Sequence, residues 1–284
     1  MNRRAFLGAL LGAAASSACR SRRAPARDSG PARRVVSISP STTEAMWAIG
    51  ATARLVGRSR YCNFPMEIQG LPQVGGYVDP NLEAILALKP DLVTGARGPI
   101  GTKLTDALEG RGVSVYFPRT ESLAEIEQMM LGLGDRIAAR AEADRAVAKL
   151  RAEVADVKSR SAGRATKRAL LVFGVSPIVA AGPKSFADEM LPLAGAQNVV
   201  TEGDAYPTLG FERVLKLDPD VIVNAAIAES HGAARIGKDD AVWSKARAVR
   251  EGRVVVIEDE SVLRPGPRLG QGLATLFRGI HGVS

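Results

Sequence analysis

Two glutamates, Glu83 and Glu212, occupy matching positions in two similar segments of the chain. Each is flanked by apolar residues that share one helical face, so each carboxylate is expected to point away from that face, towards solvent. The helix dipole alone also favours a carboxylate in a first turn. Because the pattern occurs in both segments, we interpret the two glutamates as one acidic contact on each half of the chain, placed to meet arginines of a partner.

Three of the four tyrosines lie in irregular stretches that contain glycine or proline: Tyr61, Tyr77 and Tyr206. An α/β domain usually places its few aromatic residues in the core. Aromatic residues on loops at strand ends suit a cleft, where the ring packs on a ligand and the hydroxyl donates a hydrogen bond. Simple anchoring of the loops is the alternative interpretation.

A stiff turn carries two arginines in the run Arg264-Pro265-Gly266-Pro267-Arg268, which precedes a predicted helix over 269–280. A rigid pair of guanidinium groups beside a helix start could grip a carboxylate or phosphate on a ligand. A helix-entry turn with solvated arginines explains the same run equally well. Arg97, in Gly95-Ala96-Arg97-Gly98 after another predicted strand, is a further candidate ligand-binding residue.

The sequence contains no signature of a known catalytic site. It has no Gly-x-Ser-x-Gly elbow, no His-Glu-x-x-His pair and no phosphate-binding loop. Its two histidines, His231 and His281, are too few for a histidine metal centre, and His231 lies in a polar stretch typical of a surface loop. We predict no catalytic residue, no resident metal and no cofactor.

The N-terminal segment is typical of an export signal. Arg3 and Arg4 precede a short apolar run and then small residues, so residues 1–19 resemble a twin-arginine-type signal. Cys19 stands where a lipoprotein is cleaved and acylated; the alternative is a small cysteine in a discarded leader. Residues 20–34 are predicted to form a flexible tether. We expect an exported, periplasmic protein, with a lipid anchor if Cys19 is acylated.

The positive net charge of +8 is concentrated in this same segment. Residues 1–34 carry eight arginines against one aspartate, so the remaining chain is nearly neutral. A nearly neutral folded part argues against a nucleic-acid partner. Cys62 has no cysteine but Cys19 to pair with, and we predict that it is a half-buried small apolar residue.

Segments 82–93 and 211–222 share a Glu, two Leu, a Pro and an Asp in register. The two halves also repeat the order of strand-like and helix-like stretches. We predict an α/β fold of two similar lobes with short parallel sheets, joined by one long rigid helix, with a ligand cleft between the lobes. The N-terminal lobe spans 35–120, the linking helical segment 121–165 and the C-terminal lobe 166–284.

Particular stretches within the two lobes have strand or helix signals. Ser41-Thr42-Thr43-Glu44 fits a capping box at a helix start. Buried strands are predicted from short apolar runs. These runs are 35–39, 92–94, 113–117, 169–172, 221–223 and 254–257.

Taken together, these motifs resemble the substrate-binding proteins of ABC importers for cobalamin and iron chelates. The resemblance rests on the leader, Ser39-Pro40-Ser41-Thr42-Thr43-Glu44, the run from Val74 to Glu83, Leu88-Lys89-Pro90-Asp91-Leu92-Val93 and the 264–268 turn. It implies that Glu83 and Glu212 dock on permease arginines. It also implies that Tyr61, Tyr77 and Tyr206 line the cleft, with Glu260 and Arg264 on its C-lobe side.

The resemblance implies a monomeric binding protein, and not an enzyme, that delivers a metal chelate to an ABC permease and its ATPase. Ala96 and Val179 stand where members that bind cobalamin have aromatic residues, and Tyr77 and Tyr206 replace tryptophans. The pocket is therefore less aromatic, which leaves a corrinoid, a ferric siderophore or heme as the ligand. The alternatives are an exported α/β hydrolase or chelatase acting in the cleft, and a lobe for adhesion or signalling.

Overall fold

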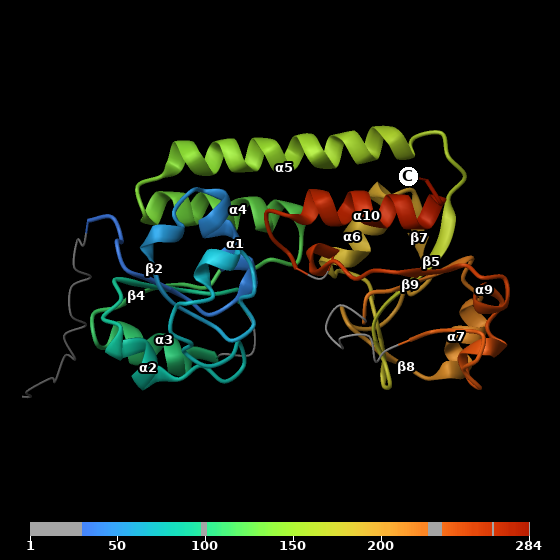
Figure 1. Cartoon of the computed structure of the whole chain (residues 1–284), viewed down its shortest axis with the longest axis horizontal. Helices are drawn as coiled ribbons and strands as arrows, with labels where there is room; N and C mark the ends of the chain where they lie inside the picture. The colour runs from blue at the N-terminus through green and yellow to red at the C-terminus, as the bar shows by residue number, and fades with distance from the viewer. Residues whose placement is uncertain (1–29, 98–100, 227–234, 263, 284) are drawn as a thin grey trace, which may run out of the picture.

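The computed structural model describes residues 30–97, 101–226, 235–262 and 264–283. The export signal, Cys19 and His231 lie outside these residues, as does most of the predicted tether. Two α/β lobes lie side by side beneath a layer of helices (Figure 1). None of the helices in the described ranges has the length and apolar character needed to cross a membrane.

The N-terminal lobe is built on a four-stranded parallel sheet with the order β2-β1-β3-β4. Its strands and the helices packed on it are β1 (Val35–Ser37), α1 (Pro40–Ala48), β2 (Leu55–Arg58), α2 (Leu82–Ala87), β3 (Leu92–Thr94), α3 (Gly101–Glu109) and β4 (Ser114–Tyr116). Two short 3-10 helices, Thr52–Arg54 and Met66–Ile68, complete the lobe. The predicted strands are present; β2 was missed because its four residues include Gly57 and Arg58.

The C-terminal lobe has a six-stranded sheet with the order β10-β9-β5-β6-β8, and β7 also pairs with β5. Its strands are β5 (Lys167–Val175), β6 (Ile178–Ala180), β7 (Ala196–Asn198), β8 (Thr208–Leu209), β9 (Val221–Asn224) and β10 (Val254–Val256). Its helical segments are α6 (Phe186–Leu193), α7 (Phe211–Leu217), Trp243–Lys245, α9 (Arg247–Arg250) and Glu260–Val262. Strands β6 and β8 run antiparallel, so this sheet is mixed and not purely parallel as predicted.

Matching hydrogen bonds in the two lobes explain the sequence repeat. The carboxylate of Asp91 accepts the backbone N–H of Arg34, and that of Asp220 accepts the N–H of Arg168, at 2.9 and 3.0 Å. The side chains of these same arginines donate to a carbonyl at the end of α2 or α7, at 2.6 and 2.7 Å. Each repeated Pro-Asp therefore ties the end of a helix to the start of a central strand.

The long helix predicted to join the lobes is α5 (Arg140–Ser161), and a second helix, α4 (Leu123–Arg136), precedes it in the same segment. The chain reverses between them, where Ala138 adopts a φ of 50°. The 22 residues of α5 span about 33 Å, and the helix runs across both lobes (Figure 1). Helix α10 (Leu269–His281) packs beside α5, so the connection is a layer of packed helices.

The predicted capping box at the start of α1 is wrong. The helix begins at Pro40 with Ser39 at its N-cap position, and no side chain caps it. Glu44 therefore lies beyond the first turn, and it is 1% exposed. Its carboxylate contacts the C-terminal lobe instead.

The tight packing of α10 predicts a stability effect at Gly272. A Cβ added there would lie 2.7 Å from the backbone carbonyl oxygen of Ser261. We expect Gly272→Ala to lower the free energy of unfolding by about 1–3 kcal/mol, because this clash outweighs the gain of up to ~1 kcal/mol in helix propensity. Urea unfolding measures the effect, with Gly237→Ala as the control because its added Cβ meets nothing within 4 Å. A Gly272→Ala protein as stable as the wild type would contradict the expectation.

Candidate functional site

The carboxyl ends of the N-lobe strands form the edge that meets the C-terminal lobe. All strands of this sheet are parallel, so the loops that follow them emerge on one edge. These loops carry Tyr61 and Tyr77 after β2, Arg97 after β3 and Glu121 after β4. The sheet thereby collects polar and aromatic side chains from distant parts of the sequence at one boundary.

Tyr206 of the C-terminal lobe reaches across this boundary. Its hydroxyl donates a hydrogen bond to Oε2 of Glu121 at 3.0 Å, and its ring lies edge-on to Phe173 with centroids 5.8 Å apart. Burial raises the pKa of the Tyr206 hydroxyl, and the negative charge of Glu121 raises it further. Burial also raises the pKa of the Tyr77 hydroxyl, and the negative charge of Glu121 raises it further.

Glu121 was missed in the sequence, although a capping signal marks its position. Ser122 caps α4 by accepting the N–H of Glu125, and the Glu125 carboxylate accepts the N–H of Glu121 at 2.9 Å. This Ser-x-x-Glu pattern is a capping box shifted by one residue. It holds the Glu121 backbone in place and leaves the Glu121 carboxylate for other contacts.

Arg264 makes a second connection between the lobes. Its guanidinium donates to the backbone carbonyl of Tyr61 at 3.1 Å and to the Glu260 carboxylate at 2.6 Å. Its Nε is buried and has no hydrogen-bond partner in the described structure. The structure thus brings together Tyr61, Glu260 and Arg264, three of the residues predicted from the sequence. Tyr61 itself remains 48% exposed.

The second arginine of the turn has a structural role that the sequence did not predict. Arg268 donates two hydrogen bonds to Glu44, at 2.9 and 2.8 Å, and its guanidinium lies over the Phe64 ring at 4.2 Å. Phe64 in turn packs edge-on against Trp47, with centroids 4.8 Å apart. Only 13% of the Arg268 side chain and 2% of the Glu44 side chain are exposed. This buried ion pair joins the start of α10 to α1 and is unavailable to a ligand.

Arg97 is the one predicted ligand-binding residue that the structure does not connect to the others. Its backbone N–H donates to the Pro118 carbonyl at 2.7 Å, which ties the loop after β3 to the loop after β4. Its side chain is exposed and has no ion pair in the described parts of the chain. Arg97 is therefore itself an uncompensated positive charge on this edge of the sheet.

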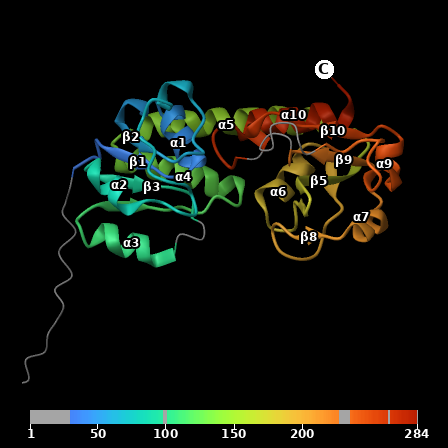
Figure 2. The ribbon, with the colours of Figure 1, turned by 60° about the horizontal axis from the view of Figure 1, so that its bottom comes forward.

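Glu83 and Glu212 are exposed in the first turns of α2 and α7, as the helical pattern predicted. Asn81 caps α2 by accepting the N–H of Ala84 at 3.0 Å. The two helices lie on the side of the lobes away from α5, and the second view shows the same separation (Figures 1 and 2). The molecule therefore presents one carboxylate per lobe on one face.

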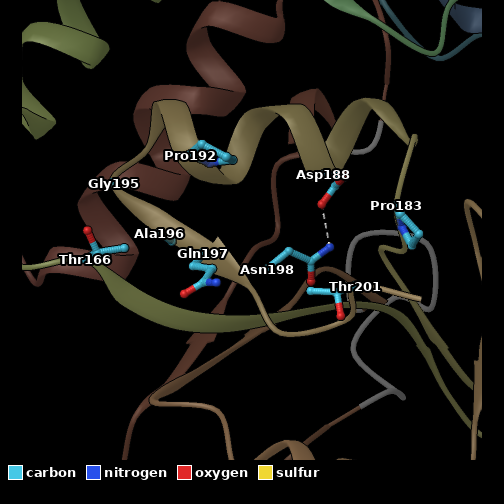
Figure 3. A pocket seen from close by; sticks show the side chains of 9 residues that line it. All are labelled: Thr166, Pro183, Asp188, Pro192, Gly195, Ala196, Gln197, Asn198 and Thr201. Atoms are coloured by element: carbon cyan, nitrogen blue, oxygen red, sulfur yellow. Dashed lines mark hydrogen bonds between the residues drawn. The ribbon is translucent and has the colours of Figure 1, made fainter. Parts of the chain in front are cut away.

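A cavity of about 560 Å³ lies in the C-terminal lobe between α6 and β7 (Figure 3). It is lined by Thr166, Pro183, Asp188, Pro192, Gly195, Ala196, Gln197, Asn198 and Thr201. The Asn198 amide donates to Asp188 at 2.8 Å and to the Ala181 carbonyl at 3.0 Å, so the lobe itself satisfies these groups. None of the predicted ligand-binding residues lines this cavity, and we assign the candidate site to the inter-lobe boundary.

Metal-ligating residues do not gather in groups of three or more in the described ranges. Cys62 is 1% exposed, which is deeper than the half-buried position predicted. Its sulfur accepts a hydrogen bond from the Thr43 hydroxyl at 3.1 Å, and burial raises the pKa of its thiol. The side chain supports the loop that carries Tyr61, as a small apolar residue would.

This geometry defines a class of protein. Two α/β lobes are held by a long helix, and candidate binding residues from both lobes meet between them, as in a protein that captures a solute between its lobes. The model of the periplasmic binding protein family matches residues 35–261, and the chain belongs to this family.

Individual relatives agree with the family assignment. The chain is 33% identical to a vitamin B12-binding protein of Salmonella paratyphi A, over 69% of this chain and 74% of that protein. It is 28% identical to an uncharacterized ABC transporter substrate-binding lipoprotein of Bacillus subtilis, over 88% of this chain and 80% of that one. The solved structure of a periplasmic heme-binding protein in complex with two hemes is 25% identical, with a TM-score of 0.79 over 89% of this chain and 99% of that one. The two-lobe fold and the solute-binding role predicted from the sequence are confirmed.

The buried pair between the lobes predicts a strong and non-additive effect on stability. Replacing Arg268, as in Arg268→Met, is expected to cost about 3–5 kcal/mol, because the Glu44 carboxylate remains buried without a cation. Glu44→Gln should cost less, because Arg268 keeps the carboxylate of Asp259 at 3.7 Å. The double variant Glu44→Leu/Arg268→Met should recover a large part of this loss. Urea unfolding tests this, with Arg140→Ala as a control that removes an exposed ion pair. A double variant whose loss equals the sum of the two single losses would contradict the coupling of Glu44 and Arg268.

The raised pKa of Tyr206 predicts a loss of stability in alkaline solution. The contribution of the buried, neutral Tyr206 to the free energy of unfolding is fully present below the unfolded-state pKa of about 10. It is lost as the pH rises further, because the unfolded chain then releases a proton that the folded chain retains. Tyr206 is 40% exposed, so the slope should stay below the ~1.4 kcal/mol per pH unit of a fully shielded proton. The stability of Tyr206→Phe should fall less steeply above pH 10 in chemical denaturation. Parallel curves for the two proteins would count against the contact.

Proposed function

We propose that this chain captures a bulky metal chelate between its lobes and delivers it to an inner-membrane ABC permease driven by its ATPase. A corrinoid is the first candidate ligand, and a ferric siderophore or heme is the second. The observation that carries the proposal is the hydrogen bond between Tyr206 and Glu121, which crosses the inter-lobe boundary. We propose binding without turnover, as in the family of binding proteins to which the chain belongs.

The chemistry of the boundary supports a flat, partly apolar ligand. Tyrosine rings offer apolar faces for packing on a macrocycle and hydroxyls for hydrogen bonds to its periphery. Relatives named for vitamin B12 and for heme both bind macrocyclic metal chelates. The ligand contacts proposed for this chain are Tyr61, Tyr77, Arg97, Tyr206, Glu260 and Arg264.

We further propose that the protein is an exported, periplasmic monomer that carries a lipid on Cys19. The relative in Bacillus subtilis is named as a lipoprotein, which supports the anchor. A flexible tether over 20–34 would let an anchored protein reach a permease in the same membrane. Metabolic labelling with a radioactive fatty acid tests the anchor, and a Cys19→Ser protein that still incorporates label would contradict it.

A spectroscopic titration tests the ligand. Residues 33–284 are titrated with cyanocobalamin, dicyanocobinamide, hemin and a panel of ferric siderophores, with visible absorption and tryptophan fluorescence as readouts. Trp47 is a useful reporter because it packs on Phe64, which contacts Arg268 at the boundary between the lobes. Saturable binding of one chelate at micromolar concentration or tighter is the expected result. No binding of any of these chelates would overturn the proposal.

The exposed glutamates predict separate effects on binding and transport. We expect Glu83→Ala and Glu212→Ala to leave chelate affinity unchanged, because both residues are exposed and stand on α2 and α7, helices on the side of the lobes away from α5. Each should reduce uptake by cells, because a docking charge for the permease is lost, and the double variant should reduce it further. The matched control is Glu142→Ala, which removes a first-turn glutamate from α5 on the opposite side of the molecule. Loss of affinity in the single variants would overturn the docking role.

A further inference from the structure

The Glu121 carboxylate stands at the inter-lobe boundary without a cation. It accepts the hydrogen bond of Tyr206, and the structure gives it no ion pair within 30–97, 101–226, 235–262 and 264–283. Its neighbour Glu125 differs, because it pairs with Arg119 and also accepts the Glu121 N–H. Glu125 therefore shapes the loop, while the Glu121 carboxylate keeps its charge and unused acceptor capacity.

Other charges around Glu121 are largely compensated. Arg60 pairs with Asp79, and Arg264 pairs with Glu260. The positive charge left over on this edge is the exposed Arg97, where water screens it strongly. Glu121 is only partly exposed and is covered by the opposite lobe, so its field on a ligand between the lobes is less screened.

The flanking segments of the C-terminal lobe add charge of the same sign. Glu202 and Asp204 lie in the loop that carries Tyr206, and Glu258 follows β10. All three are exposed and have no ion pair in the described structure. Lys184 and Arg213 offset part of this exposed charge, since Arg213 donates to the Glu202 carbonyl at 3.3 Å. The partly buried carboxylate of Glu121 is therefore the charge that a ligand at this boundary meets with the least screening.

We infer that Glu121 selects chelates whose periphery donates hydrogen bonds, such as the amide groups of a corrinoid, over chelates whose periphery carries carboxylates. This inference rests on the proposed function and narrows its ligand class. An amide N–H satisfies the free acceptor sites of Glu121 in a charge-assisted hydrogen bond. A ligand carboxylate at the same place meets a like charge in a partly desolvated site.

A matched pair of ligands tests the inference. Dicyanocobinamide and dicyanocobyrinic acid share the corrin ring, but cobinamide carries amide groups where cobyrinic acid carries carboxylates. We expect the wild type to bind the amide form at least about tenfold more tightly. Glu121→Gln should reduce this ratio by about tenfold or more, chiefly by improving the affinity for cobyrinic acid. The control Glu142→Gln, on α5, should leave the ratio unchanged.

The outcomes separate the two proposals. A wild type that binds cobyrinic acid or hemin as tightly as cobinamide would overturn the selectivity while leaving chelate binding intact. A cobinamide preference that persists unchanged in Glu121→Gln would overturn the role of this residue. No saturable binding of any of the three would overturn the proposed function and this inference with it.

Discussion

The ion pair between Glu44 and Arg268 joins two segments that are 224 residues apart in the sequence. Both side chains are withdrawn from water, so the Glu44 carboxylate depends on Arg268 for its stabilisation, while Arg268 also approaches Asp259 at 3.7 Å. The pair places the start of α10 against α1, and the neighbouring Arg264 reaches Tyr61 from the same turn. The position of the C-terminal lobe relative to the binding loops of the N-terminal lobe follows from this contact.

The helical layer makes that arrangement stiff. Helix α5 crosses both lobes, and α4 and α10 pack along it, so the connection contains few free backbone torsions (Figure 1). Gly272 of α10 allows its backbone to approach the backbone of the Glu260–Val262 segment. We expect a protein built in this way to present Glu83 and Glu212 at a nearly constant separation. We expect such a connection to permit a small closure between the lobes and not a wide hinge motion.

Local patterns predicted most of the frame. Short apolar runs located the parallel strands, the repeat located Glu83 and Glu212, and helical periodicity placed both carboxylates in solvent. Strand β8 escaped prediction because it contains only two residues. The three-residue strands β6 and β7 were missed as well. The break between α4 and α5 at Ala138 carries no glycine or proline, so the sequence offered no signal for it.

Contacts between distant segments could not be predicted in the same way. The signal around Glu44 matched a capping box, and only the folded chain shows that its partner is Arg268. Arg264 and Arg268 had equal standing in the sequence, and only the folded chain shows that Arg264 pairs with Glu260 and reaches Tyr61 while Arg268 pairs with Glu44. Glu121 became a candidate only because Tyr206, 85 residues away, contacts it in the folded chain. Long-range electrostatics therefore decided which of the polar residues form the site.

A distance measurement between the lobes tests the central claim that they are held in a nearly fixed arrangement. Spin labels are placed at two exposed positions, on Ala87→Cys of α2 and on Lys216→Cys of α7, in a chain that also carries Cys19→Ser. Double electron–electron resonance then measures the distance between the two lobes. The buried Cys62 stays in place. The account predicts one narrow distance distribution that shifts little when a saturating chelate is added. A broad or two-peaked distribution without ligand, or a large shift on binding, would contradict it.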